Sequence, residues 1–168
     1  MRKTTAPLDA GEVFPSLSVS LLDGKTLVVP AGLSHPFNIV LLNRGHWCPF
    51  CSTQLKSFQQ GLSKLNEEGI GVISISADPV DKARAAAEER GVTFPIAFGV
   101  SPAAVATALG AFYDPGNAQM PAYLQSAGFV LGSGGKIISA TYSTGPIGRL
   151  IWQDALGVVQ YVKQHAPA

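Results

Sequence analysis

The chain has 168 residues, of which 46% are hydrophobic and 14% charged, with 12 Lys and Arg against 11 Asp and Glu. This length suits one domain with a buried core, the composition excludes a disordered chain, and the balanced charge gives no basic face of the kind that binds nucleic acid. Because no apolar run is long enough for a membrane span and none follows Arg2 and Lys3 as in a signal peptide, we expect a cytoplasmic protein.

The first predicted elements are a β-hairpin and a buried strand. Alternating apolar residues over 17–21, a turn at Asp23-Gly24 and an apolar run over 27–29 are typical of a hairpin. Residues 37–42, Phe-Asn-Ile-Val-Leu-Leu, are nearly all apolar, which indicates a strand buried on both faces. This strand leads directly into the segment that holds both cysteines.

Helices and strands then alternate along the chain. Leu55, Phe58, Leu62 and Leu65 recur at helical spacing and predict a helix from Pro49 to about Glu68, ended by Gly69. The remaining predicted elements are strand 70–75, a helix capped by Asp78 and ending at Gly91, strand 94–98, a helix from Ser101 to about Leu109, an irregular surface loop over 113–126, a hairpin over 128–142 with its turn at 132–135, and a helix over 151–165.

This order of elements predicts an α/β fold in which a mixed β-sheet is flanked by helices. It is the thioredoxin-like arrangement, with an N-terminal β-hairpin as an extension. We expect a flexible N-terminus over residues 1–10 and a single domain over residues 11–168.

Both cysteines lie in one C-x-x-C segment, Cys48-Pro49-Phe50-Cys51. With Pro49 as the first helical residue, Cys48 becomes the N-cap and Cys51 the third residue of the helix. The free N–H groups and the positive end of the helix favour a thiolate at Cys48 and lower its pKa. Because residues at this spacing are close enough to form a disulfide, a redox pair is the first hypothesis.

Several other side chains are candidates for supporting roles. Arg44 is a candidate for binding an anionic substrate or stabilising a thiolate, and His46 for acting as a general base or a stabilising cation. The Trp47 side chain is expected to shield the motif. Arg149 either reaches the site or caps the corner between the last hairpin and the last helix, and the sequence favours the capping role.

The alternatives to redox chemistry are inert buried thiols or half of a zinc site. Zinc would need about four ligands, whereas the chain has three histidines and no second close pair. We therefore expect no metal, and no cofactor is needed because the sulfurs themselves carry the electrons.

Residues 42–55, Leu-Asn-Arg-Gly-His-Trp-Cys-Pro-Phe-Cys-Ser-Thr-Gln-Leu, resemble the active-site segment of the peroxiredoxin-like branch of the alkyl hydroperoxide reductase/thiol-specific antioxidant (AhpC/TSA) family. The resemblance extends through residues 73–78, 128–131 and 145–150. It implies a thioredoxin-like fold, an antioxidant activity based on thiol-dependent reduction of peroxides or disulfides, and often a homodimer.

The motif combines two redox patterns. The family carries Thr-x-x-Cys, with the peroxide-attacking cysteine last and a proline four residues before the threonine. Here Cys48 stands at the threonine, Cys51 at the attacking cysteine and Arg44 at the proline. The thioredoxin pattern instead makes Cys48 the nucleophile, so the sequence leaves open which sulfur reacts first. The family's peroxide-binding arginine is also missing from residues 125–129, and Ser126-Ala127 stands where thioredoxins have a cis-proline.

These features predict a thiol oxidoreductase that cycles between the Cys48/Cys51 dithiol and an intramolecular disulfide. The expected oxidant is a hydroperoxide or a protein disulfide, and the expected reductant is thioredoxin, glutaredoxin or a low-molecular-weight thiol. The alternative is a dimeric binding or holdase module whose C-x-x-C is vestigial or binds a metal.

Overall fold

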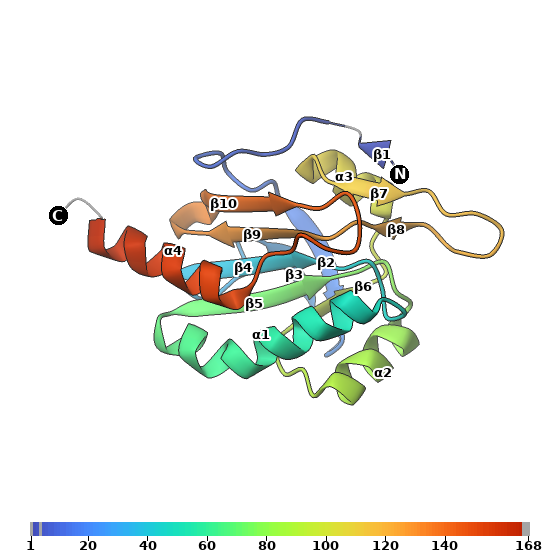
Figure 1. Ribbon diagram of the computed structural model, residues 1–168, viewed down its shortest axis with the longest axis horizontal. Helices are drawn as coiled ribbons and strands as arrows, with labels where there is room; N and C mark the ends of the chain where they lie inside the picture. The colour runs from blue at the N-terminus through green and yellow to red at the C-terminus, as the bar shows by residue number, and fades with distance from the viewer. Residues whose placement is uncertain (1, 4, 166–168) are drawn as a thin grey trace.

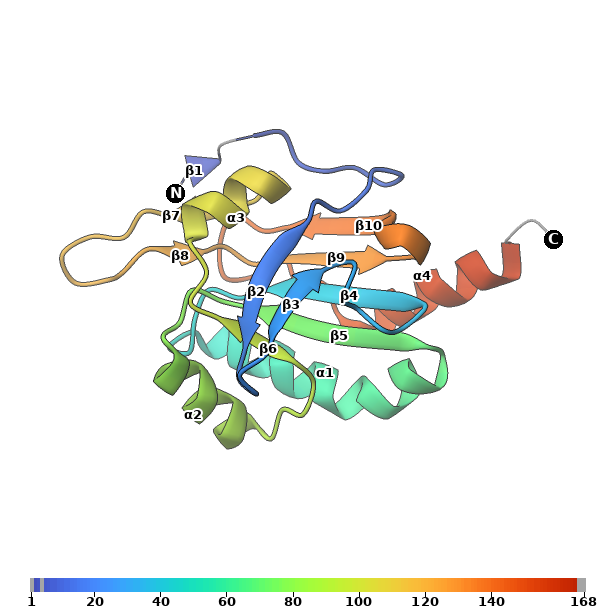
Figure 2. The same cartoon turned by 180° about the vertical axis from the view of Figure 1, so that it is seen from behind.

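A seven-stranded mixed sheet with helices on both faces forms the body of the computed structural model, which describes residues 2–3 and 5–165 (Figures 1 and 2). The sheet has the order β10 (Ile137–Tyr142), β9 (Ala127–Leu131), β4 (Phe37–Leu42), β5 (Ile70–Ile75), β6 (Ile96–Phe98), β2 (Leu17–Leu21) and β3 (Thr26–Val29). Strands β4, β5 and β6 are parallel, and the other neighbours are antiparallel. The mixed α/β fold and the β2–β3 hairpin confirm the prediction.

The helices and a small second sheet surround this sheet. Helices α1 (Pro49–Glu67) and α4 (Trp152–His165) lie over one face, as Figure 1 shows. The other elements are α2 (Val80–Arg90), α3 (Pro102–Leu109), the short 3₁₀ turn η1 (Ser133–Gly135), and a three-stranded sheet of β1 (Arg2–Lys3), β7 (Phe112–Asp114) and β8 (Tyr123–Leu124).

Strand β4 separates two hydrophobic cores because successive side chains of a strand point to opposite faces. Val40 and Leu42 belong to the core shared with α3, whereas Ile39 and Leu41 belong to the core under α1 and α4. All four side chains are fully buried. The nearly continuous apolar run therefore reflects a central strand, as predicted.

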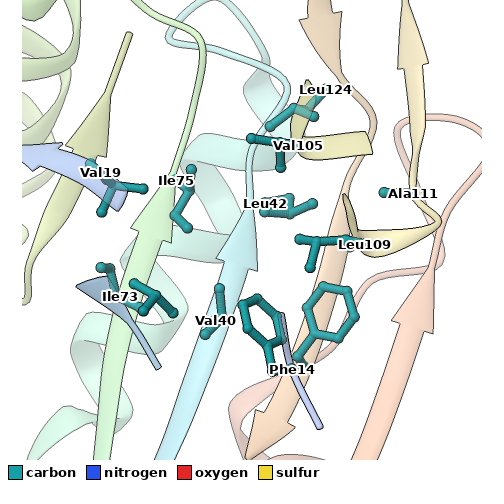
Figure 3. Close-up of a cluster of buried hydrophobic side chains, with 14 of the residues drawn as sticks. Phe14, Val19, Val40, Leu42, Ile73, Ile75, Val105, Leu109, Ala111 and Leu124 are labelled. Atoms are coloured by element: carbon teal, nitrogen blue, oxygen red, sulfur yellow. The ribbon is translucent and has the colours of Figure 1, made fainter. Parts of the chain in front are cut away.

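Each core is closed by residues from distant parts of the chain. Figure 3 shows Val105 and Leu109 of α3 beside Val40 and Leu42, with Phe14 nearby. Phe14 meets Phe129 edge-on, with 5.2 Å between ring centroids. On the other face the sheet packs against the apolar side of α1 and against α4, through Leu55, Phe58, Leu65, Ala155 and Val159. These contacts hold the start of α1 firmly at the end of β4.

The helix boundaries agree with the sequence patterns except at α2. Helix α1 begins at Pro49 with Cys48 as N-cap, and Ser101 caps α3 by accepting a hydrogen bond from the Ala104 N–H at 3.3 Å. The predicted Asp78 cap is wrong, because Pro79 is the N-cap and α2 begins at Val80. The Asp78 carboxylate is engaged elsewhere, with His46 and Ser76.

The segment 113–126, predicted as an irregular loop, contains strand residues. Strands β7 and β8 pair with each other at Tyr113–Leu124 and Asp114–Tyr123, and β7 also pairs with β1. Only residues 115–122 connect the two strands as a loop, which projects from the molecule in Figures 1 and 2. The strands are too short to show an alternating apolar pattern, which is why the sequence did not reveal them.

Besides the pairing of β1 with β7, hydrogen bonds from Thr5 and Leu8 join the N-terminal residues to the domain. The Thr5 hydroxyl donates to the Thr107 carbonyl at 2.9 Å, and the Leu8 N–H donates to the Tyr142 hydroxyl at 2.9 Å. Residues 1 and 4, and 166–168 at the other end, lie outside the described residues, and the flexibility expected for residues 1–10 stays a prediction. Within the described ranges no helix is both long and apolar enough to cross a membrane.

Candidate redox site

The C-x-x-C motif lies where strand β4 passes into helix α1. Cys48 has extended backbone angles (φ −86°, ψ 113°) as the N-cap, Pro49 is the first helical residue and Cys51 the third. Both cysteines are free thiols with no exposed surface. The predicted placement of the two sulfurs at the positive end of the helix is therefore confirmed.

Glycine 45 allows the chain to turn between the strand and the helix. Gly45 has φ 149°, and its carbonyl accepts a hydrogen bond from the Cys48 N–H at 3.1 Å. A Cβ at this position would lie 2.5 Å from Trp47 Nε1 and 3.1 Å from Asp78 Oδ1. The sequence Arg44-Gly45-His46 can thus fold tightly enough to place Arg44 beside the sulfurs.

Arg149 contacts both sulfurs from beyond the last hairpin. Its Nη2 lies 3.2 Å from Cys51 Sγ and 3.7 Å from Cys48 Sγ. Its Nη1 donates to Gln54 Oε1 at 2.7 Å and its Nε to the Pro146 carbonyl at 2.6 Å. The corner role favoured by the sequence is therefore incomplete, because Arg149 braces the corner and also reaches the site.

Buried Gln54 connects helix α1 to the segment that carries Arg149. Its side-chain Nε2 donates to the Leu150 carbonyl at 2.9 Å while its Oε1 accepts from Arg149. Gln54 follows Cys51 by three residues on the helix, so helical spacing alone predicts that the two lie on one face. This spacing is the sequence signal that could have identified Gln54.

The two thiols have pKa values displaced in opposite directions. Burial raises the pKa of Cys48, but interactions with the thiol and backbone of Cys51, together with the charges of Arg149 and Arg44, outweigh it, so the net change is downward. Burial dominates at Cys51 and raises its pKa despite the charge of Arg149, and the neighbouring Cys48 raises it further. A thiolate is thus favoured at Cys48 and a protonated thiol at Cys51.

Arg44 lies between two aromatic rings and the Cys48 sulfur. Its guanidinium carbon is 5.1 Å from the Trp47 ring centroid and 5.2 Å from that of Tyr123. Its Nη1 lies 3.8 Å from Cys48 Sγ, its Nη2 donates to the Tyr123 hydroxyl at 3.4 Å, and its backbone N–H donates to Cys51 Sγ at 3.4 Å. The aromatic rings, themselves edge-to-face at 5.0 Å, hold the cation beside the thiol.

The His46 ring pairs with the carboxylate of Asp78. The His46 Nδ1 lies 2.8 Å from Asp78 Oδ1, and Asp78 Oδ2 accepts from the Ser76 hydroxyl at 3.1 Å. Arg90 holds the same loop by donating to the His46 carbonyl at 2.7 Å and to the Ser52 hydroxyl at 3.1 Å. This cluster fixes the backbone just before Cys48.

An apolar groove of about 450 Å³ runs beside the site. Phe50 and Ile147, 46% and 69% exposed, line it together with Ile151, and Arg149 lies in its wall. A slightly larger hollow, of about 500 Å³, lies between residues 30–38 and 131–135, and neither Arg149 nor Arg44 lines it. The groove therefore adjoins a side chain that contacts both sulfurs, and the larger hollow does not.

The structure groups the sequence candidates unequally. Arg44, Trp47 and Pro49 surround Cys48 and Cys51, whereas the His46 ring pairs with Asp78. Sequence reasoning did not predict the contacts of Gln54, Asp78 and Tyr123, and it held the reach of Arg149 into the site only as the less favoured of two alternatives. Among the described residues, no group of three or more His, Cys, Asp or Glu side chains is placed to hold a metal ion.

A mixed sheet with helices on both faces and a dithiol at the start of the helix after its central strand define a thioredoxin-like protein. The chain belongs to the AhpC/TSA family, whose family model matches residues 10–139. A search of curated protein sequences gives no significant match.

Solved structures share the fold along nearly the whole chain. Peroxidoxin BcpB from Mycobacterium tuberculosis has a TM-score of 0.76 at 18% identity, covering 92% of this chain and 98% of that one. A peroxiredoxin-like protein from Aquifex aeolicus has a TM-score of 0.77 at 16% identity, covering 95% and 91%. AhpC from Enterococcus faecalis has a TM-score of 0.73 at 21% identity, covering 95% and 96%. At these identities the similarity establishes the fold.

Proposed function

We propose that this protein is a cytoplasmic thiol-dependent oxidoreductase that reduces hydroperoxides, and also disulfides, through a Cys48–Cys51 dithiol/disulfide cycle. The observation that carries the proposal is the placement of two free thiols at the start of α1, with the guanidinium groups of Arg44 and Arg149 beside Cys48 Sγ. The pKa of Cys48 is displaced downward and that of Cys51 upward, in agreement with this placement. A nucleophilic thiolate beside a protonated thiol is the arrangement that attack followed by disulfide closure requires. Membership of a thiol peroxidase-type family supports it.

The first step is attack by the Cys48 thiolate on a peroxide oxygen. The sulfur–oxygen bond forms as the oxygen–oxygen bond breaks, an alcohol or water leaves after taking up a proton, and Cys48 becomes a sulfenic acid. Arg149 and Arg44, which contact the Cys48 sulfur at 3.7 and 3.8 Å, are placed to stabilise the negative charge that moves onto the peroxide oxygens.

The second step closes the disulfide. Cys51 loses its proton and attacks the Cys48 sulfur, water leaves, and a Cys48–Cys51 bond forms. Thioredoxin, glutaredoxin or a low-molecular-weight thiol then supplies two electrons and two protons to restore both thiols. Protein disulfides enter the same cycle as oxidants when the Cys48 thiolate attacks a disulfide sulfur instead of a peroxide.

A substrate must pass the side chains that contact the sulfurs in order to reach them. Neither cysteine has exposed surface, whereas Arg44 and Arg149 are half-buried. The groove lined by Phe50 and Ile147 meets Arg149 and offers apolar surface to the organic part of a substrate. Small and organic oxidants can therefore approach the same arginine.

The proposal is tested by adding one equivalent of hydrogen peroxide to the reduced protein. We expect loss of both free thiols, a mass decrease of two hydrogens without added oxygen, and full recovery with dithiothreitol. Sustained peroxide consumption in the presence of dithiothreitol should follow. Protein that keeps both thiols after this treatment would show that the peroxidase function is wrong.

A further inference from the structure

Within the described part of the chain, the positive charges beside the sulfurs have no anionic partner. Among the described residues, none of the ion pairs involves Arg44 or Arg149. Both guanidinium groups contact the sulfurs of the thiols. Protonated thiols are neutral and compensate neither positive charge, and a thiolate at Cys48 compensates only part of one. Placing cations in a partly buried site without an anion is unfavourable, so the site favours an incoming negative charge.

Arg44 has unused hydrogen-bonding capacity, and Arg149 has little. Arg149 makes short hydrogen bonds to Gln54 and Pro146 in addition to its sulfur contacts. Arg44 makes only long side-chain contacts, at 3.8 Å to Cys48 Sγ and 3.4 Å to Tyr123, and its Nε is buried without a hydrogen-bond partner among the described residues. Since a guanidinium carries five N–H donors, Arg44 keeps donors for a carboxylate.

The other charged groups around Arg44 leave the preference of the site for a negatively charged ligand in place. Asp78 is paired with His46, whose loop is held by the cationic Arg90. Asp114, which is in register with Tyr123 on the neighbouring strand, accepts a hydrogen bond from the Gly116 N–H at 2.9 Å. The Trp47 and Tyr123 rings fix the Arg44 guanidinium at about 5 Å from each ring centroid. The cation is thus held in place for a ligand of opposite charge.

Resting on the proposed function, we propose that the reductant of the Cys48–Cys51 disulfide is a small thiol bearing a carboxylate, which Arg44 binds. The thiolate of the first molecule attacks the Cys48 sulfur, which forms a mixed disulfide and releases the Cys51 thiolate to take up a proton. A second thiolate attacks the sulfur of the bound reductant. This releases the Cys48 thiolate and a low-molecular-weight disulfide, so two electrons pass from two thiols to the protein.

Three short thiols that differ in charge test the proposal: mercaptopropionate, mercaptoethanol and cysteamine, which are anionic, neutral and cationic. The protein disulfide is formed with diamide, so the series does not depend on reaction with peroxide. Recovery of protein thiols is followed in time, and each rate constant is expressed per concentration of reagent thiolate. We expect the anionic thiol to be fastest and the cationic thiol slowest.

Substitutions at Arg44 separate local binding from general charge. In Arg44→Met the rate ratio of mercaptopropionate to cysteamine should fall about tenfold, the scale of a charge-assisted contact at a partly exposed site. Arg44→Lys should restore part of this rate ratio. Lys56→Met, which removes one charge from an exposed position of the same helix α1, should leave the ratio within about twofold because salt screens distant charges.

The outcomes separate this inference from the proposed function. Equal rates for the three thiols, or an equal fall of the ratio in Lys56→Met and Arg44→Met, would overturn carboxylate binding even if peroxide oxidises the protein. A charge preference in protein that peroxide does not oxidise would keep the inference and overturn the peroxidase function. Failure of diamide to form the disulfide would overturn both.

Discussion

Cys48 and Cys51 lie in different electrostatic surroundings. The pKa of Cys48 is lowered by the positive helix end, by the Cys51 backbone and by two arginine charges, whereas burial dominates at Cys51 and raises its pKa. In reduced protein, alkylation at Cys48 should therefore begin at lower pH than alkylation at Cys51, because a lowered pKa gives thiolate at lower pH. Site-resolved mass spectrometry over a pH series measures this order. Earlier modification of Cys51 would contradict it.

Arg149 acts on both sulfurs, and its removal should be costly for reactivity. Arg149→Met should raise the pKa of both thiols, since its charge lowers both, and slow peroxide reduction by roughly a hundredfold, the scale for losing one fixed donor. Lysine cannot reproduce the forked contacts with Gln54 and the sulfurs, so Arg149→Lys should recover only part.

Arg84 provides the matched control for this experiment. It is an exposed arginine of α2 that donates to the Leu22 carbonyl at 2.8 Å. Arg84→Met should leave both the thiol pKa values and the peroxide rate unchanged. An equal loss of rate in the two variants would mean that net charge, rather than the position of Arg149, supports the reaction.

At the scale of elements, the packing of α4 on α1 depends on one glycine. A Cβ at Gly61 would lie 2.4 Å from Trp152 Cδ2, which no ordinary contact permits. Gly61→Ala should therefore lower the free energy of unfolding by about 1–3 kcal/mol, despite the better helix propensity of alanine. Urea unfolding followed by circular dichroism measures the change.

Gly157 tests the same substitution without the contact. It is an exposed residue of α4, and a Cβ there meets nothing within 4 Å. Gly157→Ala should stabilise the protein by about 0.5–1 kcal/mol through helix propensity alone. If both alanine variants are stabilised, the tight approach of Trp152 to α1 is wrong.

Sequence patterns predicted the elements that carry strong periodicity or distinct end signals. The apolar run over 37–42 identified β4, and Pro49 after a cysteine located the start of α1. The Asp78 cap failed because its carboxylate pairs with His46, a partner 32 residues away. Local propensity cannot weigh such a tertiary contact, and the same limit applies to the short strands β7 and β8.

At the scale of the whole molecule, Tyr142 joins three distant segments. Its hydroxyl accepts from the Leu8 N–H at 2.9 Å and donates to the Leu109 carbonyl at 2.8 Å. Tyr142→Phe should lower the free energy of unfolding by about 1–3 kcal/mol because both partners lose a hydrogen bond. Tyr161→Phe, at a residue that is 61% exposed, should change it by less than about 0.5 kcal/mol.

The same tyrosine predicts a loss of stability in alkali. Burial raises the pKa of Tyr142, and the charge of Glu12 adds to this against the hydrogen bond from Leu8. Ionisation is therefore easier in the unfolded chain, so the contribution of Tyr142 is complete below the ordinary tyrosine pKa of about 10 and is lost as pH rises through the folded-state value. Wild type should lose more stability than Tyr142→Phe across this range.

The site itself depends on the whole fold. Spacing predicted the two cysteines and Arg44 together, because all three lie within eight residues of one strand-to-helix junction. The contact of Arg149 with Cys51 spans 98 residues and follows from the path of the chain after β10. Residues 125–129 hold no arginine, and Arg149 reaches the sulfurs from another segment, a placement that the sequence patterns favoured less than the corner role.

The most direct test of the account is the rate of hydrogen peroxide reaction in stopped flow for wild type, Cys48→Ser and Cys51→Ser. We predict that Cys48→Ser loses the reaction, whereas Cys51→Ser still reacts and accumulates a sulfenic acid on Cys48. Its rate should be reduced, because the Cys51 thiol helps to lower the pKa of Cys48. Loss of reaction in Cys51→Ser, with a sulfenic acid on Cys51 in Cys48→Ser, would contradict the assignment of Cys48 as the attacking sulfur.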